Sequence, residues 1–396
     1  MLFQRKMLTM AMAGTLSAFV GLNANAADNS FPSNVVSAYS QGSHADHLAG
    51  QHGKLGLDCT SCHPTGKVSD GEAEINANCT KCHGDLTAVA AKTEKAGEPN
   101  PHKSHLGTIQ CTACHSGHEA SVAYCTNCHD FPAMKKNFNK TAVNPSQVED
   151  LKKYADAMPA YTEETDLLIV GSGAAGFVAA MTAQEAGVKN IVMLEKMAIP
   201  GGNSQLAAGG MNAAGTEFQK AQGIKDTPEM MFADTMKGGK QASNPELVKI
   251  LAEESNASIE WLKARGAVLS HVGRGGGASA ARMHGPAGGT FVGPYLSDFF
   301  RNQVKANNID LRLNSKMVKL FTDDQGNVTG VLVKGKHSGL YRINAKAVVL
   351  ATGGIGANMN LVQSLRPEIS SDVKTSNQPG SQGDGMILAQ SVGADV

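Results

Sequence analysis

All eight cysteines of the chain fall in four copies of the pattern CxxCH. The copies read CTSCH at 59–63, CTKCH at 79–83, CTACH at 111–115 and CTNCH at 125–129. In this pattern two thiols can add to the vinyl groups of a haem while the next histidine ligates its iron. The cysteines that would make these attachments are Cys59, Cys62, Cys79, Cys82, Cys111, Cys114, Cys125 and Cys128.

Two other chemistries also use closely spaced cysteines. Disulfides form in exported proteins, and the sixteen residues between Cys62 and Cys79 fit the ligand spacing of a zinc ribbon. Neither chemistry requires a histidine after every second cysteine. Because all four motifs carry that histidine and no cysteine is left over, the pattern favours a tetrahaem cytochrome c domain.

The haem interpretation also predicts the iron ligands. Four haems with two histidines each need eight imidazoles, and the motifs themselves supply His63, His83, His115 and His129. Six more histidines precede residue 130, and we expect four of these to be distal ligands: His52, His102, His105 and His118. The last three crowd the third motif, and His52 closely precedes the first.

The remaining two histidines, His44 and His47, are predicted to lie on the surface near the N-terminus. Two imidazoles per iron leave no open coordination position. This domain is therefore expected to carry electrons, and the chemistry must take place elsewhere in the chain.

A second motif begins at Gly171. DLLIV at 166–170 predicts a strand, GSGAAG places Gly171, Gly173 and Gly176 at GxGxxG spacing, and a helical pattern follows from Ala175 to Ala186. A second strand, NIVMLE, then ends at Glu195. This βαβ context favours dinucleotide binding, with a pyrophosphate at the helix N-terminus and Glu195 accepting hydrogen bonds from a ribose. An acidic residue there disfavours NADP, and leaves FAD and NAD as alternatives.

Composition divides the chain into the regions that must position these motifs. Residues 1–26 have the basic, apolar and small-residue segments of a secretory signal peptide, so we expect export to the periplasm. Residues 27–130 hold few large apolar side chains, so the haems themselves would form the core among loops and short helices. Residues 131–164 form a linker with three prolines and a short helical pattern around 148–158. Residues 165–396 are expected to form an α/β, Rossmann-like domain.

Length and charge limit the possible functions. A chain of 396 residues with 41% hydrophobic residues suggests two or three domains, and no stretch after residue 26 is apolar and long enough to span a bilayer. Residues 27–130 contain six lysines, no arginine and eleven acidic residues. This acidic balance argues against a nucleic-acid partner.

Further segments carry a family resemblance. They are KMAIPGGNSQLAAGGMNAAG after Glu195, MKGG at 236–239, AVVLATGG at 347–354 and SNQPGSQGDG at 376–385. Together they resemble the flavoprotein family of fumarate reductases and succinate dehydrogenases. With four CxxCH motifs ahead of them, the chain resembles the periplasmic tetrahaem flavocytochrome c fumarate reductases over essentially its whole mature length.

The resemblance implies a function. Electrons from a quinol-oxidising membrane cytochrome would enter at the haems and pass to FAD, which would deliver hydride to the C=C bond of a small unsaturated carboxylate such as fumarate, in anaerobic respiration. Asn203 stands where membrane-bound relatives carry a flavin-linking histidine, so the FAD would be held without a covalent bond. The alternative is a tetrahaem electron carrier whose flavin domain is not catalytic.

The resemblance also implies roles for individual residues. Gly171, Gly173 and Gly176 would face the pyrophosphate, and Glu195 the adenosine ribose. The residues that would line the flavin are Asn203, Ser204, Ala208 and Gly209. Val318 would lie by the adenine, and Asp384 would help to hold the cofactor. The implied haem pairs are His52 with His63, His83 with His118, His102 with His115, and His105 with His129.

The chain departs from the family pattern in two places. In the loop at 271–289, Arg274 and Gly275 replace methionines and Gly285 replaces an arginine, which implies either a different unsaturated acid or neutral drift. The family's proton-donating arginine and substrate-binding residues lie beyond the position of residue 396. We therefore expect a fragment or a truncated reductase, and assign no catalytic residue, since His271, Arg282, His284 and Arg301 match no catalytic position of the family.

Overall fold

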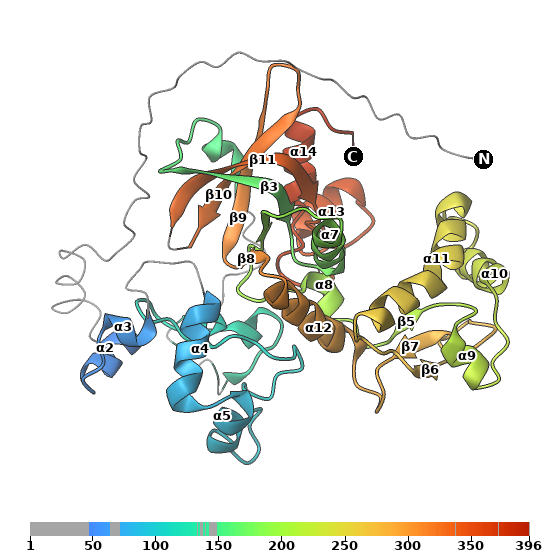
Figure 1. Ribbon diagram of the computed structural model, residues 1–396, viewed down its shortest axis with the longest axis horizontal. Coiled ribbons are helices and arrows are strands. Elements are labelled where there is room, and N and C mark those ends of the chain that lie inside the picture. The colour runs from blue at the N-terminus through green and yellow to red at the C-terminus, as the bar shows by residue number, and fades with distance from the viewer. Residues whose placement is uncertain are drawn as a thin grey trace.

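The computed structural model describes residues 47–63, 72–132, 134, 138, 140–141, 149–336, 338–370 and 372–395. The predicted signal peptide, His44 and the middle of the predicted linker at 142–148 lie outside these residues. The described chain forms a region around the CxxCH motifs, a mixed sheet covered by helices, and a smaller lobe of helices and short strands (Figure 1).

Short helices and loops make up the CxxCH region. Its elements are α2 (Leu48–Gly53), α3 (Cys59–Cys62), α4 (Glu72–His83), α5 (Leu86–Lys92), η1 (Cys111–Ala113), η2 (Tyr124–Asn127) and the parallel two-residue strands β1 (Val122–Ala123) and β2 (Lys140–Thr141). Asp58 and Asp85 accept hydrogen bonds from the first turns of α3 and α5, which fixes where these helices begin. These short helices and the loops between them confirm the predicted character of the region. Few apolar side chains are buried here.

A six-stranded sheet forms the second region, in the order β8-β4-β3-β11-β10-β9. The strands β3 (Thr162–Val170), β4 (Ile191–Leu194), β8 (Asp310–Arg312) and β11 (Gly339–Leu350) run parallel, while β9 (Ser315–Thr322) and β10 (Val328–Gly335) form an antiparallel extension. The predicted βαβ unit is therefore present, with α7 (Ala174–Glu185) between β3 and β4. This confirms the α/β class.

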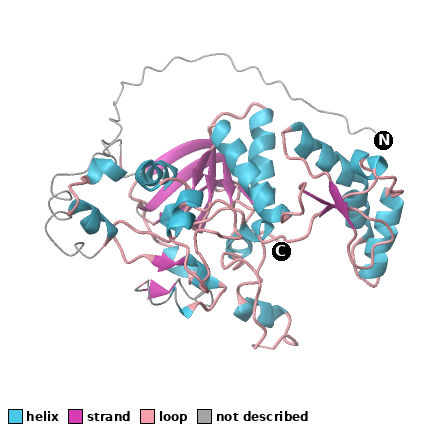
Figure 2. Cartoon of the chain, turned by 90° about the horizontal axis from the view of Figure 1, so that it is seen from below, coloured by secondary structure: helices cyan, strands magenta, loops and turns pink. Residues whose placement is uncertain are grey.

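The two faces of the sheet bury alternate residues of each strand, as the pleat requires. Ile169 and Met193 pack with residues of α7, α11 (Pro245–Ala264) and α12 (Val292–Ala306). Leu168 and Leu194 instead join a cluster that includes Leu388 of α14 (Asp384–Ser391). Helices therefore cover both faces (Figure 2).

The third region is a lobe around the short antiparallel sheet β5-β7-β6 (Met211–Asn212, Met283–Gly285 and His271–Gly273). The helices α9 (Glu217–Ala221) and α10 (Pro228–Gly238) belong to it, while α8 (Gly202–Gln205) and α13 (Met359–Leu365) lie beside the main sheet (Figure 1). Within the described residues, every helix is too short or too polar to cross a bilayer.

The first strand of the α/β domain begins within the predicted linker at 131–164. Strand β3 begins at Thr162 because the polar run TEET pairs with residues 342–345 of β11. Ahead of it, the η3 turn (Leu151–Tyr154) places Tyr154 against Val318 and Leu332 of the sheet. Pairing with β11 thus places residues 162–164 in the sheet, although their composition alone indicated a linker.

This packing predicts that Tyr154→Ala destabilises the sheet. The side chain is 7% exposed, and truncating a buried aromatic residue costs about 3–5 kcal/mol. Thermal unfolding of the full haem-loaded chain, followed by far-UV circular dichroism, should show a clearly lowered midpoint. Lys152→Ala changes an exposed side chain of the same turn and serves as the control. Equal midpoints for both variants would contradict this assignment.

Candidate functional site

The eight histidines predicted as iron ligands form four pairs of neighbouring rings. The ring centres of His102 and His115 lie 6.2 Å apart, and those of His105 and His129 lie 5.8 Å apart. The ring centres of His52 and His83 lie 6.1 Å apart, and those of His63 and His118 lie 6.2 Å apart. An iron bonded to one nitrogen of each ring at about 2 Å would place the ring centres roughly 6 Å apart. All four separations fit bis-histidine coordination of a haem iron.

Two of the four ring pairs differ from the pairings that the resemblance implied. His52 lies beside His83, and His63 lies beside His118, whereas the resemblance implied His52 with His63 and His83 with His118. The reason is the path of residues 48–63, which contact two segments at once. Ala49 N–H donates to the Gly117 carbonyl at 2.9 Å, and Asn78 of α4 donates to the Cys62 carbonyl at 3.0 Å. Residues 48–63 therefore lie against both α4, which carries His83, and the segment that carries His118.

The cysteines of the motifs are all free thiols. Among the residues that the structure describes, no three His, Cys, Asp or Glu side chains gather as ligands of one metal ion. His47 caps the start of α2 and is not part of the four ring pairs.

The third and fourth motifs lie against the flavin domain. Ile109 and Ala113 pack on Ile199 in a small buried cluster. Gln205 donates a hydrogen bond to the Leu106 carbonyl. Tyr124, directly before Cys125, accepts a 2.8 Å hydrogen bond from Nε2 of Gln378. The segments that carry Cys111 and Cys125 are thus fixed to the loops after β4 and before α14.

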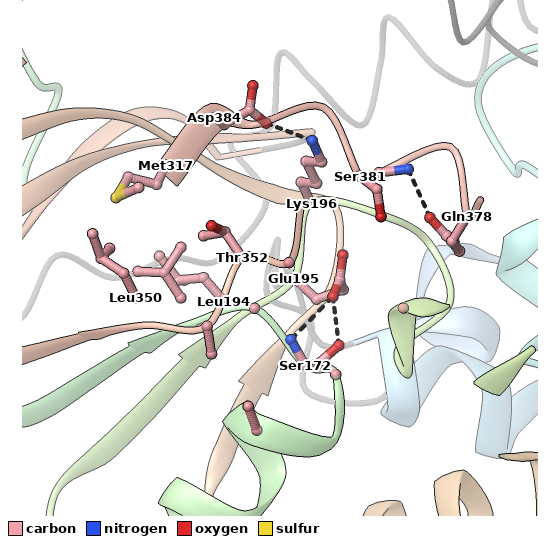
Figure 3. A pocket seen from close by; sticks show the side chains of 18 of the residues that line it. Ser172, Leu194, Glu195, Lys196, Met317, Leu350, Thr352, Gln378, Ser381 and Asp384 are labelled. Carbon is pink, nitrogen blue, oxygen red and sulfur yellow. Dashed lines mark hydrogen bonds and ion pairs between the residues drawn. The ribbon is translucent and has the colours of Figure 1, made fainter. Parts of the chain in front are cut away.

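Gln378 also lines a cavity of about 300 Å³ at the carboxyl ends of β3, β4 and β11 (Figure 3). This edge of a parallel sheet is where doubly wound domains bind dinucleotides. Four further predicted residues line the cavity, besides Gly171 and Gly173 of the first turn: Glu195, Asn203, Ser204 and Asp384. Gly202, which was not predicted, lies beside them.

The glycines of the first turn have different roles. Gly171 adopts φ +107°, and a Cβ there would come within 2.2 Å of the Ala351 carbonyl oxygen. Gly173 caps α7 at the cavity wall, where an added Cβ would meet nothing closer than 3.8 Å. Gly176 was predicted to face the pyrophosphate, but it is buried, and a Cβ there would lie 2.0 Å from the Gly171 carbonyl oxygen. Its role is close packing of α7 on the turn, because only a residue without a side chain fits.

Glu195 and Asp384 bring buried carboxylates to the cavity. Oε2 of Glu195 accepts hydrogen bonds from the backbone N–H and the hydroxyl of Ser172 at 3.2 and 2.5 Å, and burial raises the pKa of Glu195. Asp384 forms a 2.5 Å ion pair with Lys196 through Oδ2 (Figure 3). Its buried Oδ1 accepts no hydrogen bond and lies 3.6 Å from Nζ of Lys316. That oxygen can still accept a hydrogen bond from a ligand.

Besides Gly176, three residues predicted to hold FAD do not line this cavity. The side chain of Val318 packs with Tyr154 on one face of β9, while its neighbour Met317 faces the cavity, because successive residues of a strand point to opposite faces. Ala208 and Gly209 lie between Ala207 and Gly210, which line a second, apolar cavity of about 230 Å³ that shares Ala174 and Ser204 with the first. Sequence reasoning missed Lys196, Lys316 and Gln378, although Lys196 follows directly on the identified Glu195.

Three ionisable residues of the lobe are engaged in contacts within the protein. Arg282 is buried in ion pairs with Asp226 and Asp234, at 2.8 and 2.9 Å. His284 is fully buried, with Nε2 2.8 Å from the Thr216 hydroxyl. Arg274 donates to carbonyls of its own loop, those of Ala278 and Ser279.

The residues present fit FAD. A dinucleotide phosphate can approach the start of α7 over Gly173, a ribose hydroxyl can reach Glu195, and Asp384 retains an open acceptor. Asn203 is engaged in hydrogen bonds: its Oδ1 accepts from Gln378 N–H at 2.7 Å, and its Nδ2 donates to Asn377 at 2.6 Å. As an amide, it offers no nucleophilic ring nitrogen for a covalent flavin link.

Comparisons with known proteins agree with this division. The FAD binding domain family matches residues 166–396, and the cytochrome c3 family matches residues 51–130. A fumarate reductase (cytochrome) of Shewanella frigidimarina is 43% identical over 357 residues, which cover 88% of this chain and 59% of that protein. A urocanate reductase of Eggerthella lenta is 34% identical over 252 residues, covering 62% and 41% of the two chains.

Among solved structures, the open conformation of a flavocytochrome c3 fumarate reductase matches with a TM-score of 0.78 and 41% identity, over 88% of this chain and 62% of that one. The chain thus spans about three fifths of the length of the fumarate reductases that it matches. It belongs to the FAD binding domain family, and the cytochrome c3 domain ahead of that domain makes it a homologue of the flavocytochrome c fumarate reductases.

Proposed function

We propose that the chain is the haem- and FAD-binding part of an exported oxidoreductase that reduces the C=C bond of a small unsaturated carboxylate. One observation carries this proposal: four imidazole pairs at iron-ligating separation lie in a region that is bonded, through Tyr124 and Gln378, to a dinucleotide cavity. The names of the relatives, fumarate reductase and urocanate reductase, support the substrate class.

In the CxxCH region, the cysteine pairs would tether four c-type haems, and the paired histidines would ligate their irons from both faces. Bound haems would supply one-electron transfer. The two histidines of each pair come from separate segments of the chain, so ligation would join those segments. Hydrogen bonds such as Asn76 Oδ1 with Cys111 N–H, at 2.6 Å, fix the motifs on neighbouring helices.

In the flavin domain, the chain would bind FAD without a covalent bond. Bound FAD would supply hydride transfer to an electron-poor C=C bond. The helix start at Gly173 favours the negative pyrophosphate, Lys196 and Lys316 add positive charge at the cavity, and Glu195 would orient a ribose. The buried carboxylate of Asp384 holds Lys196 in place.

The contacts of Tyr124 favour the fourth motif as the point where electrons leave the haem region. Tyr124 directly precedes Cys125 and contacts a residue of the cavity wall. Burial raises the pKa of Tyr124, so its ring stays neutral and adds no charge between the two sites. A periplasmic location and a quinol-oxidising membrane cytochrome as electron donor complete the proposal, on the basis of the signal-like residues 1–26.

The cavity assignment predicts that Asp384→Asn weakens FAD binding. The substitution leaves Lys196, which is largely buried, without its anionic partner at 2.5 Å, so that lysine loses its fixed position. We expect the FAD dissociation constant to rise about tenfold, measured by equilibrium dialysis of the haem-loaded protein. Asp372→Asn, an exposed carboxylate, is the control. Equal affinity in both variants would remove Asp384 from the site.

The electron route predicts unequal effects of removing two different haems. Replacing Cys125 and Cys128 by alanine should slow the reduction of bound FAD by dithionite-reduced haems, observed by stopped-flow absorbance. The matched control replaces Cys59 and Cys62 of α3, an element that makes none of the interface contacts described above. If the control variant slowed flavin reduction as much as the first, the fourth motif would not be the exit.

The substrate class predicts turnover in a panel assay. The haem-loaded protein, with reduced viologen as donor, should consume at least one of fumarate, methacrylate and urocanate under anaerobic conditions. Because the chain spans about three fifths of its matched relatives, the assay should be run on the whole polypeptide encoded by the reading frame. Ready haem reduction with no acceptor consumed would instead support an electron carrier.

A further inference from the structure

The imidazole of His102 is held by a side chain from a different element. Nδ1 of His102 lies 2.9 Å from the hydroxyl oxygen of Thr93, which follows the last turn of α5. By contrast, Nδ1 of His52 contacts the Leu48 carbonyl at 2.9 Å, within its own helix. The position of the His102 ring thus depends on how α5 meets the following loop.

The hydrogen bonds of Thr93 decide which nitrogen of His102 carries the proton. A threonine hydroxyl has one hydrogen to donate, and three oxygens that can only accept surround it. They are the carbonyl oxygens of Val89 at 2.8 Å and Ala90 at 3.5 Å, and Oδ1 of Asn100 at 3.3 Å. The hydroxyl hydrogen therefore goes to Val89, and the hydroxyl oxygen of Thr93 accepts a hydrogen bond from Nδ1–H of His102. That tautomer leaves the lone pair of Nε2 available for a metal.

The loop between Thr93 and His102 is itself fixed. Asn100 donates to the Ala90 carbonyl and to Glu94, each at 2.8 Å, and its Oδ1 accepts from the His102 N–H at 3.0 Å. Glu94 also forms a 2.8 Å ion pair with Lys103. The backbone of His102 is thus held independently of Thr93, so removing the hydroxyl changes the ring contact and leaves the loop in place.

The ring planes divide the four pairs into two classes. His102 and His115 are parallel to within 3°, and His63 and His118 to within 18°. The other two pairs are nearly perpendicular, at 77° and 86°. The angle matters because it sets the energies of the two iron d orbitals that interact with the imidazole π systems. Two parallel rings donate to the same one of these orbitals, so the two differ widely in energy. Perpendicular rings donate to one each, so the two are nearly equal in energy. The electron paramagnetic resonance signal of each ferric haem therefore reports its ring angle.

We propose that Thr93 is a positioning residue for the haem of the third motif. By accepting a hydrogen bond from Nδ1–H of His102, it keeps that ring parallel to His115 and lowers the reduction potential of the haem. The potential is lowered because a histidine that donates from Nδ1 becomes a stronger ligand for ferric iron. This inference rests on the proposed bis-histidine haems. The number of attached haems is therefore measured first, by mass spectrometry of the unmodified protein, so that fewer than four would count against the proposed function and not against Thr93.

The test compares Thr93→Val, which keeps the shape but loses the hydroxyl, with Thr93→Ser, which keeps the hydroxyl. With four haems retained, the valine variant should show one altered low-spin ferric resonance of the parallel class. One of its four redox steps should shift to higher potential, by on the order of tenfold in the redox equilibrium or ~59 mV. The serine variant should match the unmodified protein in both measurements.

Identical spectra and potentials in the valine and serine variants would overturn the proposal. So would a change in all four haems of the valine variant, because that would indicate a general structural effect. Thr93→Ala controls for any disturbance caused by the methyl group that valine has in place of the hydroxyl. If both the valine and alanine variants lost a haem while the serine variant kept all four, the role of Thr93 would be attachment and not positioning.

Discussion

The separation of the paired imidazoles is the constraint on which the rest of the CxxCH region depends. This region buries few apolar side chains, so the hydrophobic effect alone gives it little reason to be compact. Each of the four ring pairs nevertheless spans roughly 6 Å, and each joins two separate segments of the region. Iron ligation would therefore serve as the cross-links of this region, much as metals do in other small domains with little core.

The flavin domain is instead held together by a hydrophobic core. Its parallel strands are buried on both faces by α7, α12 and α14, and the cavity lies at the edge where their carboxyl ends meet. Two glycines are required there for close approach of backbone segments, Gly171 against Ala351 and Gly176 against Gly171. The packing of Ile109 on Ile199 and the Tyr124–Gln378 hydrogen bond join this edge of the sheet to the CxxCH region.

Local patterns in the sequence predicted the elements that local chemistry determines. The CxxCH spacing, the strand–glycine turn–helix order around Gly171 and the acidic residue at the end of β4 are each readable within a short window. The structure places them as expected and brings Asn203, Ser204 and Asp384 to the same cavity from distant segments. The family resemblance was needed for these last residues, because no local pattern connects them.

Long-range geometry accounts for what the sequence did not predict. The pairing of His52 and His63 depends on which segments lie on either side of residues 48–63, and spacing along the chain carries no information about that. The strand extension at Thr162 and the packing of Tyr154 arise from pairing with β11 and contact with β9 and β10. The side chain of Val318 packs against Tyr154, and it is the neighbouring Met317 that lines the cavity, because successive residues of a strand point to opposite faces.

The central claim is that the chain binds four haems covalently and FAD reversibly. The most direct test is the intact mass of the exported protein under denaturing acid, with the released small molecules collected and identified. The account predicts four haem additions on each polypeptide and free FAD in the released fraction. Fewer than four haem additions, or a flavin retained on the polypeptide, would contradict it.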